Sequence, residues 1–184
     1  MIKLEQPQAI KIAKIIEETK DSRTFGFYHS TKAKPGQFIL LWLPRVDMKP
    51  FGISRQEKNY FEITVCKVGP FTKALFHKKV GDWVGIQGPY GTSFDTSYKS
   101  VAIVAGGYGV APLAFLADVL LEKGADVTFI YGAKTADRLI YQKRFKNNPN
   151  FKIIWVTDDG SFGERGFATD ALERVLVKNN KICP

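Results

Sequence analysis

The chain has 184 residues, of which 45% are hydrophobic and 24% charged, a composition typical of a globular protein with one large domain or two small ones. Its apolar runs stay short of the roughly 18 residues that a membrane span needs, and the polar stretch 1–8 lacks a signal-peptide core, so we expect a cytoplasmic protein. Two cysteines, Cys66 and Cys183, are too few for a disulfide framework or a four-ligand metal site.

The net charge of +9 raises the hypothesis of nucleic-acid binding. The basic residues are scattered through both halves, however, without a dense stripe that is interleaved with aromatic residues. Attraction of phosphate-bearing cofactors, or a solvated lysine-rich surface, explains the charge equally well. We therefore predict no nucleic-acid partner.

Strand and turn signals dominate the first half of the chain. Strands are predicted at 9–17, 24–28, 37–43, 60–68 and 82–87, with one short helix at 71–78. Short strands at such spacing predict a small closed antiparallel barrel.

The pattern changes near residue 99, where strands and helices begin to alternate. Strands at 101–105, 126–131 and 152–156 are each followed by a predicted helix, at 110–123, 135–146 and 167–177. This alternation predicts a parallel sheet covered by helices. We place the domain junction within 88–100, giving domains 1–97 and 98–184. Because 181–184 looks like the beginning of another strand, we expect the second domain to be incomplete at its C-terminus.

The first strand of the second half ends in a glycine loop, Gly106-Gly107-Tyr108-Gly109, at the start of a helix. Backbone N–H groups at such a helix start bind phosphate. Dinucleotide dehydrogenases have a third glycine where Pro112 stands, and an acidic residue where Gly132 stands. The loop therefore predicts a nucleotide site of another type, in which Pro112 fits the first helical turn.

A second candidate site lies in the first half, at Lys49, Pro50, Phe51, Gly52 and Ile53. Lys49 can pair with phosphate, Phe51 can stack on a flat ring, and Gly52 lets backbone amides approach closely. The alternative interpretation is an edge strand with one core aromatic residue, since proline is common in edge strands.

Three further loops can contribute to binding. Gly69 and Thr72 form a turn into the short helix that either binds an anion or is a plain capped turn. Lys134 follows the second parallel strand, and Asp158 and Asp159 follow the third, at the edge of the sheet where ligands bind. Lys134 can neutralise phosphate, and either aspartate can accept from ribose or nicotinamide groups. A solvated loop is the alternative for each.

The order of the motifs KPFGIS, VGPFT, GPYG, GGYGVAPL, YGAKT and TDDGSFGERGFATD resembles the ferredoxin–NADP reductase superfamily. Within it, the chain most resembles the electron-transfer subunits of two-component dihydroorotate dehydrogenases, over residues 8–181. The last motif indicates this branch. The resemblance implies that Lys49–Gly52 occupies the place of an R-P-x-S flavin motif. Lysine for arginine then loses bidentate phosphate recognition, and Gly52 lacks a hydroxyl near the reactive flavin nitrogen.

The resemblance also assigns the remaining candidates. Gly69 and Thr72 match the phosphate turn of the barrel. Gly106, Gly107, Gly109 and Pro112 match the pyridine-nucleotide loop, and Lys134 takes the place of an arginine. NADH and NADPH are not distinguished by these residues. No side chain stands out as a general acid or base, which agrees with direct hydride transfer between FAD and NAD(P).

The implied function is that of an FAD-dependent NAD(P) oxidoreductase subunit of pyrimidine biosynthesis. Its expected partner is an FMN-containing dehydrogenase subunit, which exchanges electrons with the flavin through a [2Fe–2S] cluster. The cysteine ligands of that cluster are absent from this chain apart from Cys183, so we expect a protein that ends at Pro184 to be impaired in this exchange. Alternatives are a reductase subunit of a hydrogenase, sulfide dehydrogenase or transhydrogenase complex, and a cofactor-free regulatory module.

Overall fold

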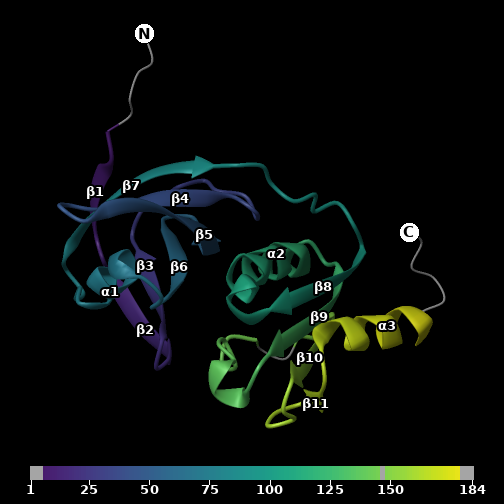
Figure 1. Cartoon of the computed structure of the whole chain (residues 1–184). Coiled ribbons are helices and arrows are strands. Elements are labelled where there is room, and N and C mark those ends of the chain that lie inside the picture. The colour runs from purple at the N-terminus through teal and green to yellow at the C-terminus, as the bar shows by residue number, and fades with distance from the viewer. Residues whose placement is uncertain (1–5, 146–147, 179–184) are drawn as a thin grey trace.

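An antiparallel sheet of seven strands forms the N-terminal half of the computed structural model, which describes residues 6–145 and 148–178 (Figure 1). The strands follow the order β1-β7-β4-β5-β6-β3-β2, and helix α1 (Pro70–Phe76) connects β6 to β7, close to the predicted short helix. The strands are β1 (Gln8–Lys11), β2 (Lys14–Thr19), β3 (Ser22–Phe27), β4 (Phe38–Leu43), β5 (Asp47–Glu57), β6 (Tyr60–Cys66) and β7 (Trp83–Tyr90).

The two end strands of the sheet, β1 and β2, are consecutive in the chain. Ile12 N donates to Asp82 O at 2.9 Å, and Ala13 N donates to Gly26 O at 2.8 Å. The chain thus crosses here from one end of the sheet to the other. The predicted antiparallel barrel is confirmed. The single strand predicted over 9–17 is wrong, because the chain changes its pairing partner at 12–13.

Alternate strand residues fill the barrel core, as the period of two requires. Phe25, Phe27 and Phe61 are fully buried, and the rings of Phe27 and Phe61 stack with their centroids 5.0 Å apart. The outer face of the same strands carries polar residues such as Thr24, which is also buried. Burial of polar residues on an outer barrel face indicates that another part of the chain covers it.

Strand β5 changes partner midway. Residues 47–52 pair with β4, and pairing with β6 begins only at Ile53. Within the described residues no strand pairs with 47–52 on the side away from β4, so Pro50 has the environment of an edge strand. The motif at Lys49–Gly52 therefore lies where the two parts of the barrel wall separate.

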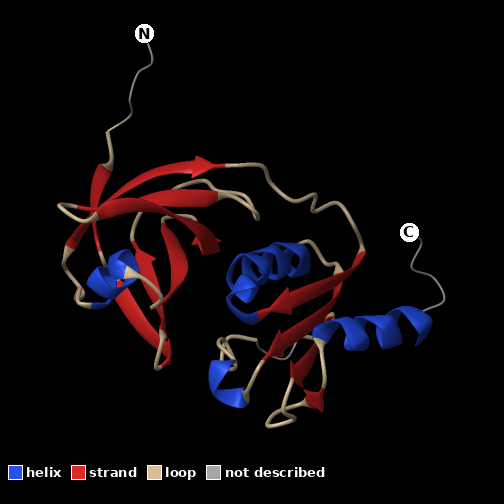
Figure 2. Ribbon diagram, in the orientation of Figure 1, coloured by secondary structure: helices blue, strands red, loops and turns tan. Residues whose placement is uncertain are grey.

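The C-terminal half is a parallel sheet in the order β11-β10-β9-β8. Figure 2 shows its strands in red and the neighbouring helices in blue. Helix α2 packs on one face against Ile103 and Phe129, and helix α3 packs on the other against Val104 and Ile130. The predicted parallel sheet with helices is therefore confirmed. The elements are β8 (Ser100–Gly106), β9 (Asp126–Ala133), β10 (Phe151–Thr157), β11 (Glu164–Arg165), α2 (Val110–Glu122), α3 (Ala168–Lys178) and the 3-10 turns η1 (Gly107–Gly109) and η2 (Ala136–Arg138).

Helix α2 joins the two halves. Its alanine-rich side packs on the parallel sheet, whereas Phe115, which is 3% exposed, belongs to the hydrophobic cluster of the barrel. The helix is therefore apolar on two sides, as expected of a helix between two layers. None of the described helices is long and apolar enough to cross a membrane.

The helix predicted over 135–146 is wrong over its described part, which contains only the turn η2. Two of its backbone amides have acceptors outside the segment: Ile140 N donates to Tyr131 Oη at 3.2 Å, and Tyr141 N donates to Glu18 Oε2 at 3.3 Å. Tyr141 also has a φ of 65°, which no helix allows. The strand expected from 181–184 lies outside the described residues.

Candidate functional site

The glycine loop lies at the carboxyl end of β8, directly before α2. A Cβ added to Gly106, Gly107 or Gly109 has no other atom within 4 Å, so the space beside the loop is open. Gly107 also has a φ of 52°, a conformation that side chains disfavour. Packing within the protein thus does not explain Gly106 and Gly109, and the open space is what a phosphate cradle needs.

The neighbouring strand ends place Lys134 and Asp158 on the same edge of the sheet, both exposed. Asp159 is also exposed, and its Oδ1 accepts from Ser161 N at 3.0 Å and from Ser161 Oγ at 2.6 Å; cofactor binding by Asp159 stays a prediction. These hydrogen bonds lower the pKa of Asp159 and shape the loop. A Cβ on Gly132 would lie 3.0 Å from Ala168 Cβ, so close packing against α3 explains the glycine where dehydrogenases have an acid.

In the barrel, Lys49 Nζ lies 2.5 Å from Asp47 Oδ2, and this contact lowers the pKa of Asp47. Phe51 is half-buried and stacks on Phe71 with ring centroids 5.8 Å apart. Ile53 is fully buried in the core, so only its backbone can face a ligand. Lys49 and the open edge of β5 are thus the parts of this motif that remain accessible.

The turn before α1 is closed by its own side chain. Thr72 Oγ1 accepts from Val68 N at 2.9 Å and from Gly69 N at 3.0 Å, and it donates to Gly69 O. This is the arrangement of a capped turn. Anion binding by Gly69 and Thr72 stays a prediction.

The two candidate sites face each other across the interface between the halves. A Cβ on Gly52 would lie 3.4 Å from Pro112 Cβ, an ordinary van der Waals contact. Because Gly52 belongs to the barrel motif and Pro112 to the helix that follows the glycine loop, the structure brings these two predicted segments together.

A polar network beside this contact was missed by sequence reasoning. Arg144, whose side chain is 11% exposed, donates from Nη2 to Ser54 O at 2.7 Å and to Asp118 Oδ2 at 2.6 Å. The hydroxyl of Tyr141 hydrogen-bonds that of Thr64, and burial raises the pKa of Tyr141. No local pattern marks Arg144, because its partners lie 90 and 26 residues away in the chain.

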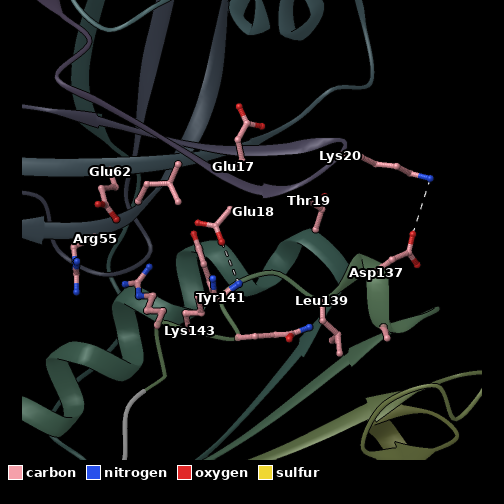
Figure 3. A pocket seen from close by; sticks show the side chains of 14 residues that line it. Glu17, Glu18, Thr19, Lys20, Arg55, Glu62, Asp137, Leu139, Tyr141 and Lys143 are labelled. Carbon is pink, nitrogen blue, oxygen red and sulfur yellow. Dashed lines mark hydrogen bonds and ion pairs between the residues drawn. The ribbon is translucent and has the colours of Figure 1, made fainter.

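A cavity of about 750 Å³ runs along the same interface, between the β2–β3 hairpin and residues 136–144 (Figure 3). Its lining includes no predicted site residue. Its lining has equal numbers of acidic and basic side chains, so its charge does not favour an anion. The charged residues are Glu17, Glu18, Glu62, Asp137, Lys20, Arg55, Lys143 and Arg144. Among the described residues, no group of three or more His, Cys, Asp or Glu could hold a metal ion.

No protein-family model matches the chain. It is 43% identical over 173 residues to a Methanocaldococcus jannaschii protein and 39% identical over 165 residues to one from Thermococcus kodakarensis. Both carry the name "Probable dihydroorotate dehydrogenase B (NAD(+)), electron transfer subunit". The alignments cover 94% and 90% of this chain, but 65% and 68% of the relatives. The chain thus spans about two thirds of their length.

Solved structures give the same fold. An NADH-dependent reduced ferredoxin–NADP oxidoreductase matches 94% of this chain and 65% of its own, with a TM-score of 0.80 and 30% identity. A ferredoxin–NADP+ reductase from Neisseria gonorrhoeae, solved with FAD and NADP, matches 98% of this chain and 82% of its own at a TM-score of 0.79. Its 18% identity supports the fold alone.

Proposed function

The chain belongs to the family of dihydroorotate dehydrogenase B electron transfer subunits, and on this premise we propose that it passes electrons between FAD and a nicotinamide dinucleotide. The observation that carries the proposal is the approach of Gly52 to Pro112. This contact supports the proposal, because electron transfer between two bound rings requires that the segments proposed to bind them lie next to each other.

We assign FAD to residues 1–97. The backbone of 49–52 lacks a strand partner on one side, which leaves its hydrogen-bonding groups available to a ring edge. Lys49 is the accessible cation for the FAD phosphates, with Gly69 and Thr72 at the second anion position. When bound, FAD and the nicotinamide supply the hydride-transfer chemistry, and the protein orients them.

We assign the dinucleotide to residues 98–184. Gly106, Gly107 and Gly109 leave open space at the start of α2, where the helix dipole favours phosphate. Lys134 is the accessible cation beside them, and Asp158 is the exposed acceptor for ribose or amide groups. Asp159 accepts hydrogen bonds from Ser161 within the loop that carries Asp158. We therefore assign Asp159 a role in holding this loop, and Asp158 the direct contact with the ligand.

We further propose an FMN-containing dehydrogenase subunit as partner, in pyrimidine biosynthesis, because the relatives are named as electron transfer subunits. The described residues do not fit a [2Fe–2S] cluster, since Cys66 is their only free cysteine and such a cluster needs four ligands. No step is therefore assigned to a cluster within these residues.

The test is anaerobic reduction of the FAD-loaded protein by NADH or NADPH, with a one-electron dye as acceptor. We expect the yellow flavin absorbance to bleach and the dye to be reduced, and the more effective nucleotide identifies the cofactor. Bound FAD that neither nucleotide bleaches would contradict the proposal. A colourless protein that cannot take up FAD would favour the cofactor-free regulatory module.

A second candidate function is the reductase subunit of an NADH-dependent ferredoxin–NADP oxidoreductase. It is favoured by the 30% identity to such a structure over 94% of this chain. The two functions differ in the partner, so purification from the native source separates them. A dihydroorotate-oxidising subunit that copurifies supports the first, and a ferredoxin-linked subunit supports the second.

A further inference from the structure

The segment 139–145, here named the strap, follows β9 and the turn η2 and lies against the barrel. It begins on its own sheet, where Ile140 N donates to the hydroxyl of Tyr131. Tyr141 then reaches the barrel through Glu18 and Thr64. Tyr141 is buried with a φ of 65°, a costly conformation for a bulky residue. Such strain persists only where surrounding contacts determine it, and here the contacts come from both halves.

Arg144 completes the strap by joining two further elements. Its Nη2 atom alone contacts Ser54 O on β5 and Asp118 Oδ2 on α2, and its guanidinium lies 4.8 Å from the ring centre of Tyr141. Ser54 is two residues from Gly52 on the same strand, and Asp118 lies on the helix that contains Pro112. Arg144 therefore ties together the strand and the helix whose Gly52 and Pro112 face each other.

Stability alone does not account for this arginine. Its Nε and Nη1 atoms are buried without a hydrogen-bond partner, which adds to the cost of removing a charge from water. Buried ion pairs of this kind often stabilise a fold no better than apolar residues of the same volume do. A conformational role, fixing one element relative to another, explains the arrangement better.

We propose that Arg144 is a positioning residue that holds β5 and α2 in register and so sets the spacing of the two cofactor segments. The inference rests on the proposed function, and it adds a determinant of the transfer rate that touches neither cofactor segment directly. Reacting groups must lie within about 3–3.5 Å, and a displacement of about 1 Å can slow transfer by ~100-fold.

The test compares Arg144→Met with Arg144→Lys, and with Arg174→Met as the matched control. Arg174 pairs with Glu164 on the surface of the same half, away from the barrel. For Arg144→Met we expect the limiting rate of FAD reduction at saturating NADH to fall about 10- to 100-fold, with a change in NADH affinity below about 2-fold. Arg144→Lys should recover most of the rate, because one nitrogen makes both contacts in the native protein. Arg174→Met should leave both quantities unchanged.

A second readout needs no bound cofactor. Spin labels at Val80→Cys on the barrel and Lys152→Cys on β10, with both native cysteines replaced by serine, report the distance between the halves. We expect a narrow distribution in the parent protein and in Arg174→Met, and a broader one in Arg144→Met. If Arg144→Met does not fold, Asp118→Asn tests the same contact from the helix side.

Unchanged rate and unchanged distance distribution in a folded Arg144 variant would overturn the inference. A rate loss that matches only a loss of folded or FAD-loaded protein would also overturn it. Failure of the parent protein to accept electrons from NADH or NADPH contradicts the proposed function instead, and the distance measurement then still decides whether Arg144 positions the two halves.

Discussion

Some glycines of this chain are required by close packing or by a positive φ, whereas others have neither requirement. A Cβ on Gly163 would lie 2.2 Å from Trp155 O, and its φ is 67°, so the fold requires this glycine. Gly109 has neither a close neighbour nor a positive φ. Neither packing nor backbone conformation therefore requires a glycine at Gly109, and close approach of a ligand is the reason that we propose for it.

Gly109→Ala is therefore expected to fold as well as the parent protein, or better by up to about 1 kcal/mol, because alanine restricts the unfolded chain. Its NAD(P)H affinity should fall about tenfold or more, since the added methyl occupies the space beside the loop. Thermal unfolding and calorimetric titration with NADH measure the two effects. Gly163→Ala is the control, with an expected loss of about 1–3 kcal/mol in stability. Unchanged affinity in Gly109→Ala would exclude the loop as a phosphate cradle.

At the scale of elements, apolar periodicity in the sequence predicted the helices and strands whose burial follows from their own residues. The helices at 110–123 and 167–177 and the three parallel strands agree with α2, α3, β8, β9 and β10 within a few residues, because their apolar periodicity matches their burial. The helix at 135–146 failed because the acceptor for Tyr141 N is Glu18, 123 residues away. No local window contains that information.

In the candidate site, too, the sequence predicted the separate motifs but not the contacts between them. The barrel motif and the glycine loop were predicted from turn chemistry, but their approach depends on the packing of α2 against β5, which no motif encodes. Side chains that act across the interface, such as Arg144, therefore need the structure.

The junction of β9 and the strap predicts a specific weakness at alkaline pH. Tyr131 is fully buried, and burial raises its pKa to about 12. Between about pH 10 and 12 the unfolded chain loses this proton while the folded one keeps it, so stability falls as pH rises, and it is fully present below pH 10. We expect Tyr131 to account for about 2–3 kcal/mol of this loss.

Urea unfolding at neutral pH and at about pH 11.5 measures the effect. The matched variant Tyr131→Phe lacks the ionisable hydroxyl but keeps the ring, so its stability should depend less on pH over this range, although it loses the hydrogen bond to Ile140 N. If both proteins lose the same stability between the two pH values, the buried tyrosine is not the cause.

At the scale of the whole molecule, the two halves share one helix rather than a simple surface contact. Phe115 of α2 is buried in the barrel cluster, and the next residue, Leu116, is buried in the cluster of the parallel sheet. Adjacent residues of one helix thus belong to two cores. Movement of the halves relative to each other must disrupt at least one of them, which explains how a two-lobed protein can hold two ring-binding segments at a fixed spacing.

This arrangement predicts different consequences for two neighbouring truncations. Phe115→Ala should cost about 3–5 kcal/mol and lower amide hydrogen-exchange protection in β5, the barrel strand that α2 packs against, as well as in α2. Leu116→Ala should cost about 2–5 kcal/mol and lower protection mainly in β8 and β9. Because only the first truncation loosens the contact between the halves, the limiting rate of flavin reduction should fall more in folded Phe115→Ala than in folded Leu116→Ala. Exchange measured by mass spectrometry, element by element, tests the point: unchanged protection of β5 in Phe115→Ala would show that α2 is not part of the barrel core.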